Sequence, residues 1–130
     1  KVFTILKESG RCIIQIPTSD SLDFYIWRGR SVWIGAPQHK HLFTDKTFTA
    51  LAVKCGFRVS GRANDWISPQ LFVWSFLYEF ERRSGAYIPM EYKKAISLVL
   101  LPAHILIAGV AAIFNMSPFK TYYLEKARPS

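Results

Sequence analysis

Residues 11–60 contain two strand patterns joined by a helix pattern, and this order constrains the fold more than any other feature of the chain. Residues 11–16 (RCIIQI) are mostly apolar and β-branched and end at Pro17, which is typical of a strand covered on both faces. Thr44 suits a helix N-cap, and the apolar residues after it recur with helical spacing. Residues 57–60 then alternate as a second strand. This order predicts a right-handed crossover between two parallel strands.

The rest of the chain consists of one irregular segment, a long apolar segment and a last strand. Residues 18–43 are irregular and rich in aromatic side chains, glycine and histidine, so we expect them to be functional or partly helical. A helix pattern over residues 70–83 follows Ser68, and residues 95–119 carry no formal charge. Residues 121–127 read as the final strand. We therefore expect residues 64–120 to form an apolar helical insertion before that strand.

Charge and cysteine usage limit the partners and the compartment. The formal charge of +8 favours anionic partners, but the cations form no dense run, so we expect no nucleic-acid partner. The two cysteines, Cys12 and Cys55, lie in apolar patterns and read as small buried residues of a reducing compartment. The chain has no signal-peptide pattern and opens in a helix-like segment at Lys1. We therefore expect a cytoplasmic protein, and a chain whose upstream part is missing.

Three sequence passages in order resemble class I S-adenosylmethionine-dependent methyltransferases. Residues 6–17 (LKESGRCIIQIP) are similar to the passage that leads into the fifth strand of that family, although Ser9 replaces the usual first glycine. Residues 37–43 (PQHKHLF) resemble the P-x-H-x-x-x-F signature of a broad subfamily, in which a helix and G-F-x-V follow. Here residues 56–59 (GFRV) supply that last passage.

The resemblance implies an α/β fold, the C-terminal half of a Rossmann-like doubly wound sheet. Strands 11–17 and 57–63 would be parallel, strand 121–127 would lie antiparallel between them, and the whole chain, 1–130, would be a partial methyltransferase domain. The implied reaction is methyl transfer from S-adenosylmethionine to a small or lipid-like acceptor. The family holds this cofactor with a glycine-rich turn, but the chain has no G-x-G. We therefore expect the chain to supply the acceptor side and to lack the cofactor-binding half, and its cofactor-binding residues are unknown.

Candidate substrate-binding residues lie after the first strand. Pro17 and Thr18 stand at the carboxyl end of that strand, where ligand clefts of open α/β sheets form, or they simply end the strand. Aromatic side chains that follow are suited either to an acceptor pocket or to packing of a lid over the sheet. These side chains are Tyr25, Trp27, Trp33 and Phe43. Packing is favoured for Phe43, and the pocket or lid for Trp27 and Trp33.

His39 is the candidate catalytic residue because it matches the histidine of the signature. An imidazole at a cleft mouth suits a general base toward an acceptor hydroxyl. The alternative, which we favour, is a structural ring that ties the loop to backbone. His39 and His41 would need a third ligand to hold a metal, so we expect none.

The uncharged residues 95–119 also suggest contact with a membrane. The run is long enough to cross a bilayer, but Pro102 and His104 interrupt it, which favours a partly exposed helical insertion. Basic flanks at Lys93, Lys94 and Lys120 would suit an anionic membrane surface, which would make the protein peripheral to the membrane. The alternative function is therefore a non-catalytic membrane-associated or partner-binding α/β module. The edge of strand 11–17 would invite pairing with a second copy as a homodimer.

Overall fold

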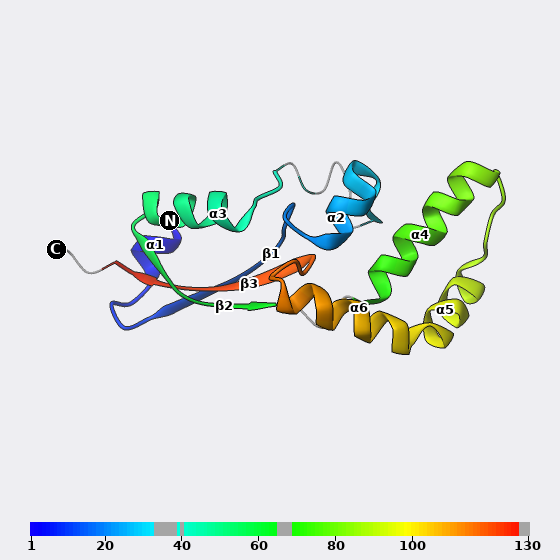
Figure 1. Cartoon of the computed structure of the whole chain (residues 1–130). Coiled ribbons are helices and arrows are strands. Elements are labelled where there is room, and N and C mark those ends of the chain that lie inside the picture. The colour runs from blue at the N-terminus through cyan, green and yellow to red at the C-terminus, as the bar shows by residue number, and fades with distance from the viewer. Residues whose placement is uncertain (33–38, 40, 65–68, 128–130) are drawn as a thin grey trace.

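A three-stranded sheet forms one end of the molecule in the computed structural model, which describes all residues except 33–38, 40, 65–68 and 128–130 (Figure 1). The strands are β1 (Arg11–Pro17), β2 (Phe57–Asn64) and β3 (Phe119–Lys126). The helices near the sheet are α1 (Val2–Ile5), α2 (Leu22–Trp27), the short 3-10 helix η1 (Arg28–Arg30) and α3 (Asp45–Lys54). Between β2 and β3 the chain forms α4 (Pro69–Ser84), α5 (Met90–Val99) and α6 (Leu101–Ile113).

The last strand lies in the middle of the sheet. The strand order is β1-β3-β2, and β3 pairs antiparallel with both neighbours, so β1 and β2 run in the same direction. The predicted position and direction of the last strand are therefore confirmed. Both ladders between the named strands are antiparallel, so the protein is a mixed α/β structure with a small antiparallel sheet. A bulge between Val59 and Gly61 shifts the register of β2.

One face of the sheet carries the core under α3 and α1 (Figure 1). Phe48 and Ala52 of α3 pack on β2 and β3, and the Phe48 and Tyr122 ring centroids are 4.2 Å apart. Thr44 caps α3 in a capping box with Thr47, as its sequence predicts for the N-cap. Gly56 then turns the chain into β2 at φ +85°. A Cβ atom there would stand 2.9 Å from the Phe3 ring, so glycine is required on both counts.

The opposite face of the sheet is not covered at β1, so the prediction of a strand covered on both faces is wrong. Burial alternates along β1, and Ile13 is 62% exposed. The reason lies in the sequence: Ile13 is the only strongly apolar side chain on an outward face that also holds Arg11. Arg11 and Arg58 form ion pairs across the strands with Glu125, at 2.9 and 2.7 Å.

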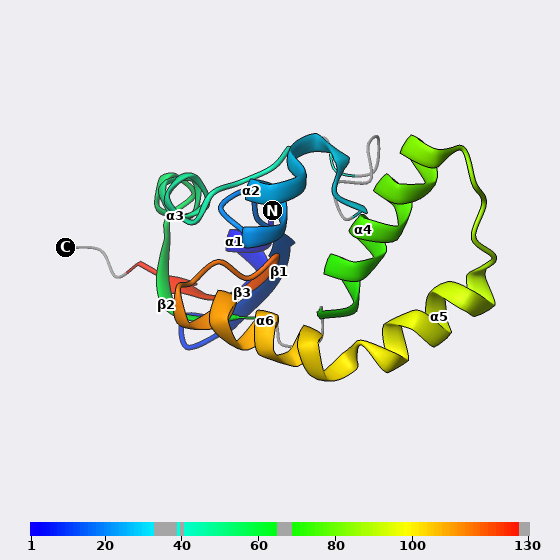
Figure 2. The same ribbon diagram turned by 45° about the vertical axis from the view of Figure 1, so that its right-hand side comes forward.

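The predicted insertion is helical, and α4, α5 and α6 extend beyond one end of the sheet (Figures 1 and 2). The uncharged run is two helices rather than one, because the chain breaks at Leu100, just before Pro102. Within the described residues no single helix combines the length and the apolar composition of a membrane span. Only α5 and α6 taken together meet that test, with a bend of 70° between them.

Three side chains are not placed as their sequence patterns predict. Cys55 is exposed rather than buried, because it caps α3 beyond the last buried turn, whereas Cys12 is half-buried. Lys93 is 3% exposed and pairs with Glu81 at 2.7 Å. Lys120 is 1% exposed and pairs with Asp20 at 3.2 Å. Neither lysine therefore acts as a solvated basic flank of the apolar run.

Candidate functional site

The carboxyl end of β1 is held by its neighbours rather than open. Pro17 is the last residue of the strand and lies opposite Phe119. Thr18 is buried, and its amide N–H donates to the Pro118 carbonyl at 2.9 Å. Its hydroxyl donates to the Ser117 carbonyl at 3.0 Å. Since both polar groups of Thr18 are used, the residue anchors the start of the following segment.

That segment forms α2, whose cap decides which side chains face inward. Ser21 is the N-cap, and its hydroxyl accepts from the Phe24 amide at 3.1 Å. This start places Asp23 in the first turn, where it is only 4% exposed. Trp27 ends the helix and is partly buried, whereas Tyr25 lies on the outer side and is 77% exposed.

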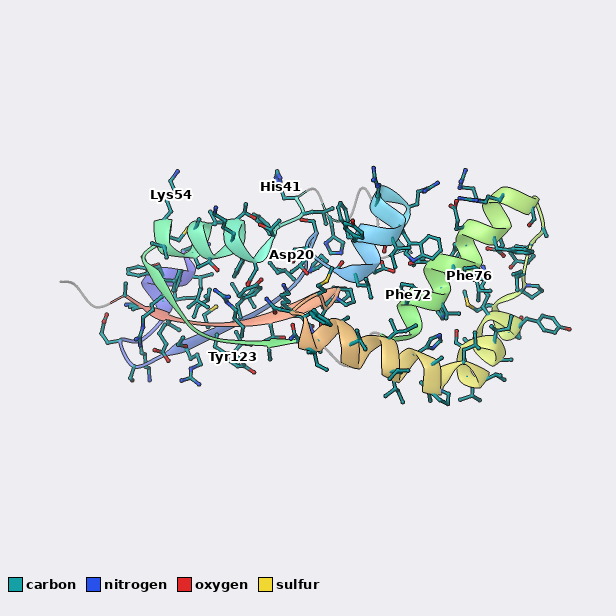
Figure 3. All side chains as sticks on the ribbon, viewed as in Figure 1. Asp20, His41, Lys54, Phe72, Phe76 and Tyr123 are labelled. Atoms are coloured by element: carbon teal, nitrogen blue, oxygen red, sulfur yellow. The ribbon has the colours of Figure 1, made fainter. Side chains whose placement is uncertain are left out.

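The inner side of α2 packs against α4, and we name this contact the α2–α4 interface. Its residues are Asp23 and Trp27 of α2, Ser31 after η1, and Phe72, Ser75 and Phe76 of α4. The Trp27 ring lies 6.0 Å from Phe72 and 6.2 Å from Phe76, both of which come from α4 (Figure 3). The Ser31 hydroxyl donates a hydrogen bond to Asp23 Oδ2, and the Ser75 hydroxyl lies close enough to influence the same carboxyl group. The interface is thus apolar with a few buried polar groups, as ligand sites commonly are.

Burial sets the charge state of Asp23. It raises the pKa of the Asp23 carboxyl from its ordinary 3.8 to about 6, and the hydroxyl groups of Ser31 and Ser75 limit the rise. One oxygen, Oδ1, has no hydrogen-bond partner among the described residues, and the indole Nε1 of Trp27 has none among them either. Asp23 is therefore a carboxylate at neutral pH that can take up a proton close to that range.

The nearby Glu79 has the opposite environment, although it is equally buried. Hydrogen bonds from Arg82 and Arg83, together with the charge of Arg30, lower the pKa of Glu79 to about 2. The three cations lie 2.7 to 3.2 Å from the same carboxyl oxygen. Glu79 is therefore a fixed anion that joins η1 to α4, and it is not suited to exchange a proton.

A second polar cluster joins α3 to the sheet. Asp45 accepts from Tyr122 Oη at 2.9 Å and from Arg62 Nη1 at 2.8 Å. Asp20 accepts from the Asp45 amide at 2.8 Å and from Lys120 Nζ at 3.2 Å. Burial and Asp45 raise the pKa of the Tyr122 hydroxyl, which therefore remains a donor. A hollow of about 570 Å³ lies beside this cluster, but the charged groups named here satisfy one another, so we assign the cluster a structural role.

An apolar cavity of about 450 Å³ lies between α1, α3 and the sheet. Its walls include Phe3, Cys12, Phe48 and Leu124. Almost all of its lining is hydrocarbon or aromatic, so it has few groups that could orient a ligand. The α2–α4 interface combines apolar walls with unpaired polar atoms and is the better candidate.

The residues predicted from the sequence have different places. Trp27 belongs to the α2–α4 interface, but Phe43 packs on the core with its ring 6.0 Å from Phe48. His39 and His41 are exposed. Trp33 lies outside the described residues, as do residues 37, 38 and 40 of the signature. Within the described part of the chain, no three His, Cys, Asp or Glu side chains are grouped as a metal site needs.

Sequence reasoning missed Asp23, Ser31 and Ser75. The one available signal was Ser21 followed two positions later by an acid, which is typical of a helix start. An acid in a first turn is normally explained by the helix dipole, so that signal would have identified α2 but not the buried carboxylate.

Comparison with known proteins adds no relative: no protein-family model, no curated protein and no solved structure matches this chain.

Proposed function

We propose that this chain is the acceptor-side part of an S-adenosylmethionine-dependent methyltransferase that acts on a small or lipid-like acceptor. The observation that carries the proposal is the sheet, in which β3 lies antiparallel between two strands of common direction. The resemblance in residues 6–59 implies this arrangement for the end of a Rossmann-like methyltransferase fold. A short helix, strand β1, a connecting segment, α3 and β2 also follow one another in the implied order.

The α2–α4 interface supports the acceptor side of this proposal. It follows the carboxyl end of β1, the end of a strand at which α/β folds bind ligands. Its aromatic side chains suit an apolar acceptor body, and its buried polar groups suit one polar function on that acceptor. In methyl transfer the protein mainly aligns the two reactants, and walls of this kind supply such alignment.

Among the described residues, the turn after β1 does not fit the cofactor itself. A nucleotide cradle needs free backbone N–H groups at the turn after a strand. After β1 the amides of Thr18 and Ser19 already donate to the carbonyls of Pro118 and Phe43, each at 2.9 Å. We therefore assign cofactor binding to a part of the fold outside this chain.

Calorimetry with S-adenosylhomocysteine tests the proposal. We expect binding by the natural polypeptide that contains this chain, and none by the chain alone. Adenosine serves as the control ligand, since it lacks the amino-acid part of the cofactor. Absence of binding by the natural polypeptide would refute the methyltransferase proposal. Binding by the chain alone would instead refute the assignment of the cofactor to another part of the fold.

One observation favours a second function, attachment to a membrane surface. Leu106, Val110 and Ile113 recur along α6 at i, i+4 and i+7 and are 70%, 44% and 79% exposed. We name these residues the α6 stripe. The neighbouring Leu98 and Val99 of α5 are also more than 70% exposed, and no formal charge occurs in either helix after Lys94. Exposed apolar side chains repeated along a helix in this way are typical of membrane or protein contact.

Vesicle co-sedimentation tests this second function. Because Lys93 and Lys120 are buried in ion pairs, we expect apolar insertion to contribute more than charge, although anionic vesicles should still bind best. Leu106→Asp should lower vesicle affinity by at least about tenfold, since burying a leucine side chain is worth about 2 kcal/mol. Val53→Asp is the matched control, because Val53 is 62% exposed but lies on α3. A chain that ignores anionic vesicles at low salt would end this proposal.

A further inference from the structure

In the part of the chain that the structure describes, two buried polar atoms of the α2–α4 interface lack hydrogen-bond partners. They are the Asp23 oxygen Oδ1, an acceptor, and the Trp27 nitrogen Nε1, a donor. Native proteins satisfy nearly all buried polar atoms, so each exception calls for an explanation. The other Asp23 oxygen does accept a hydrogen bond, from the Ser31 hydroxyl, which fixes the carboxyl group in place.

The two unpaired atoms belong to one place in the fold. Asp23 and Trp27 are four residues apart on α2, so their side chains project from the same side of the helix. Both reach the same face of α4: the Asp23 carboxyl group lies near Ser75, and Trp27 contacts Phe72 and Phe76. An acceptor and a donor are thus carried on one side of α2, the side that faces the aromatic rings of α4.

The chemistry of this pair selects the ligand group. A hydroxyl can donate to a carboxylate oxygen and accept from an indole N–H with the same oxygen atom. An ammonium group can only donate, so it would leave Trp27 unpaired. A phosphate or carboxylate can only accept, and the Asp23 charge would repel it. The aromatic side chains of Trp27, Phe72 and Phe76 favour an apolar body next to that hydroxyl.

We propose that the α2–α4 interface binds the hydroxyl group of an apolar, phenol-like ligand, which donates to Asp23 Oδ1 and accepts from Trp27 Nε1. This deepens the proposed function, and it rests on that function in one respect: if the ligand is the methyl acceptor, its hydroxyl oxygen is the atom methylated. Asp23 would then be the group that receives the hydroxyl proton, a task for which its burial suits it.

Phenol is the probe, and the measurement is the indole N–H resonance of Trp27 in the ¹⁵N-labelled full chain, assigned with Trp27→Phe. Phenol should shift this resonance in a saturable way. Toluene lacks the hydroxyl and anisole cannot donate, so both should bind at least about tenfold more weakly than phenol, the loss expected for one charge-assisted hydrogen bond. Asp23→Asn should weaken the binding of phenol by about tenfold and leave the binding of toluene unchanged.

Tyr25→Phe is the matched control, because it removes an exposed hydroxyl on the same helix. It should leave the affinities for phenol and toluene unchanged. If phenol and toluene bind alike, the hydroxyl is not recognised and the proposal fails. It also fails if phenol does not bind and only a long-lived water is detected beside the indole. Phenol binding does not require the cofactor. Failure of this proposal is therefore distinct from failure of the methyltransferase proposal, which calorimetry with S-adenosylhomocysteine tests.

Discussion

Replacing Asp23 by Asn should stabilise the protein at neutral pH, against the usual effect of changing a buried residue. Asp23 is 4% exposed, and burial raises the pKa of its carboxyl to about 6. As the pH rises, Asp23 therefore keeps its proton up to about pH 6 in the folded state, whereas it loses the proton near pH 3.8 in the unfolded chain. Asn has nearly the same shape and carries no charge, so it removes the cost of burying an anion.

The sign and size follow from the two pKa values of Asp23. A folded-state pKa above the unfolded value contributes stability below pH 3.8, and this contribution is lost as the pH rises through about 6. One pKa unit corresponds to about 1.4 kcal/mol, so the whole change is about 3 kcal/mol. The free energy of unfolding of Asp23→Asn, relative to the unaltered chain, should therefore rise by about 3 kcal/mol between about pH 3.5 and pH 7.5.

Urea denaturation of both proteins over this pH range measures the difference. The carboxyl groups of Glu79, Glu81 and Glu125 have lowered pKa values, and their opposite effect is common to both proteins and cancels. Leu51→Ala is the control, because it removes no titratable group, so the difference in its free energy of unfolding from that of the unaltered chain should not change with pH. A pH-independent difference for Asp23→Asn, or a loss of stability at neutral pH, would refute the charge state that we assign to Asp23.

Three further stability predictions follow, each checked by urea denaturation. Phe48→Ala should lower the free energy of unfolding by about 3–5 kcal/mol, because it opens a cavity in the core. Leu51 is 42% exposed on the same helix, so Leu51→Ala should lower it by only about 1 kcal/mol. Equal losses would contradict the core assignment. Gly85→Ala should lower the free energy of unfolding by about 1 kcal/mol, because of the positive φ of Gly85 alone. Gly56→Ala should lower it by more, since its Cβ atom also meets the Phe3 ring. The reverse order would show that the ring gives way. His104→Leu should stabilise the protein by about 1 kcal/mol at neutral pH, because both ring nitrogens are buried without partners among the described residues. Burial lowers the pKa of His104, so the stability of this variant relative to the unaltered chain should rise further as the pH falls below 6.5; a less stable variant at both pH values would mean that the ring has a partner.

The sheet was predictable because its signals are local. Residues 11–16 and 57–60 are short strand patterns with clear ends, and a helix with a good N-cap lies between them. The position of β3 was predicted from the resemblance, since nothing in its own residues specifies its neighbours. The uncovered face of β1 could also have been read from the sequence, because Cys12, Ile14 and Ile16 alternate and only Ile13 breaks the pattern.

The α2–α4 interface was not predictable, because its chemistry depends on packing between distant segments. Asp23 is 8 residues from Ser31 in the sequence, and Val32 is 43 residues from the Ser75 hydroxyl to which its amide donates. In the sequence, Asp23 resembles an ordinary acid in the first turn of a helix. Only the contact with α4 turns it into a buried carboxylate with one unpaired oxygen.

The helical unit of α4, α5 and α6 links the two surfaces to which we assign ligands. One face of α4 forms a wall of the α2–α4 interface, and α4 also packs on α6, which presents the α6 stripe to solvent. A hydroxyl on an apolar body, the group that Asp23 and Trp27 select, is also the chemistry of a lipid-like acceptor that partitions into membranes. The two surfaces remain separable by substitution, because Leu106→Asp removes an exposed side chain and Asp23→Asn a buried charge. If Leu106→Asp abolishes vesicle binding but leaves phenol binding intact, the stripe delivers the protein to the membrane and α4 serves recognition alone. If both are lost together, α6 holds α4 in place, and the stripe is part of the same folded unit rather than an independent contact.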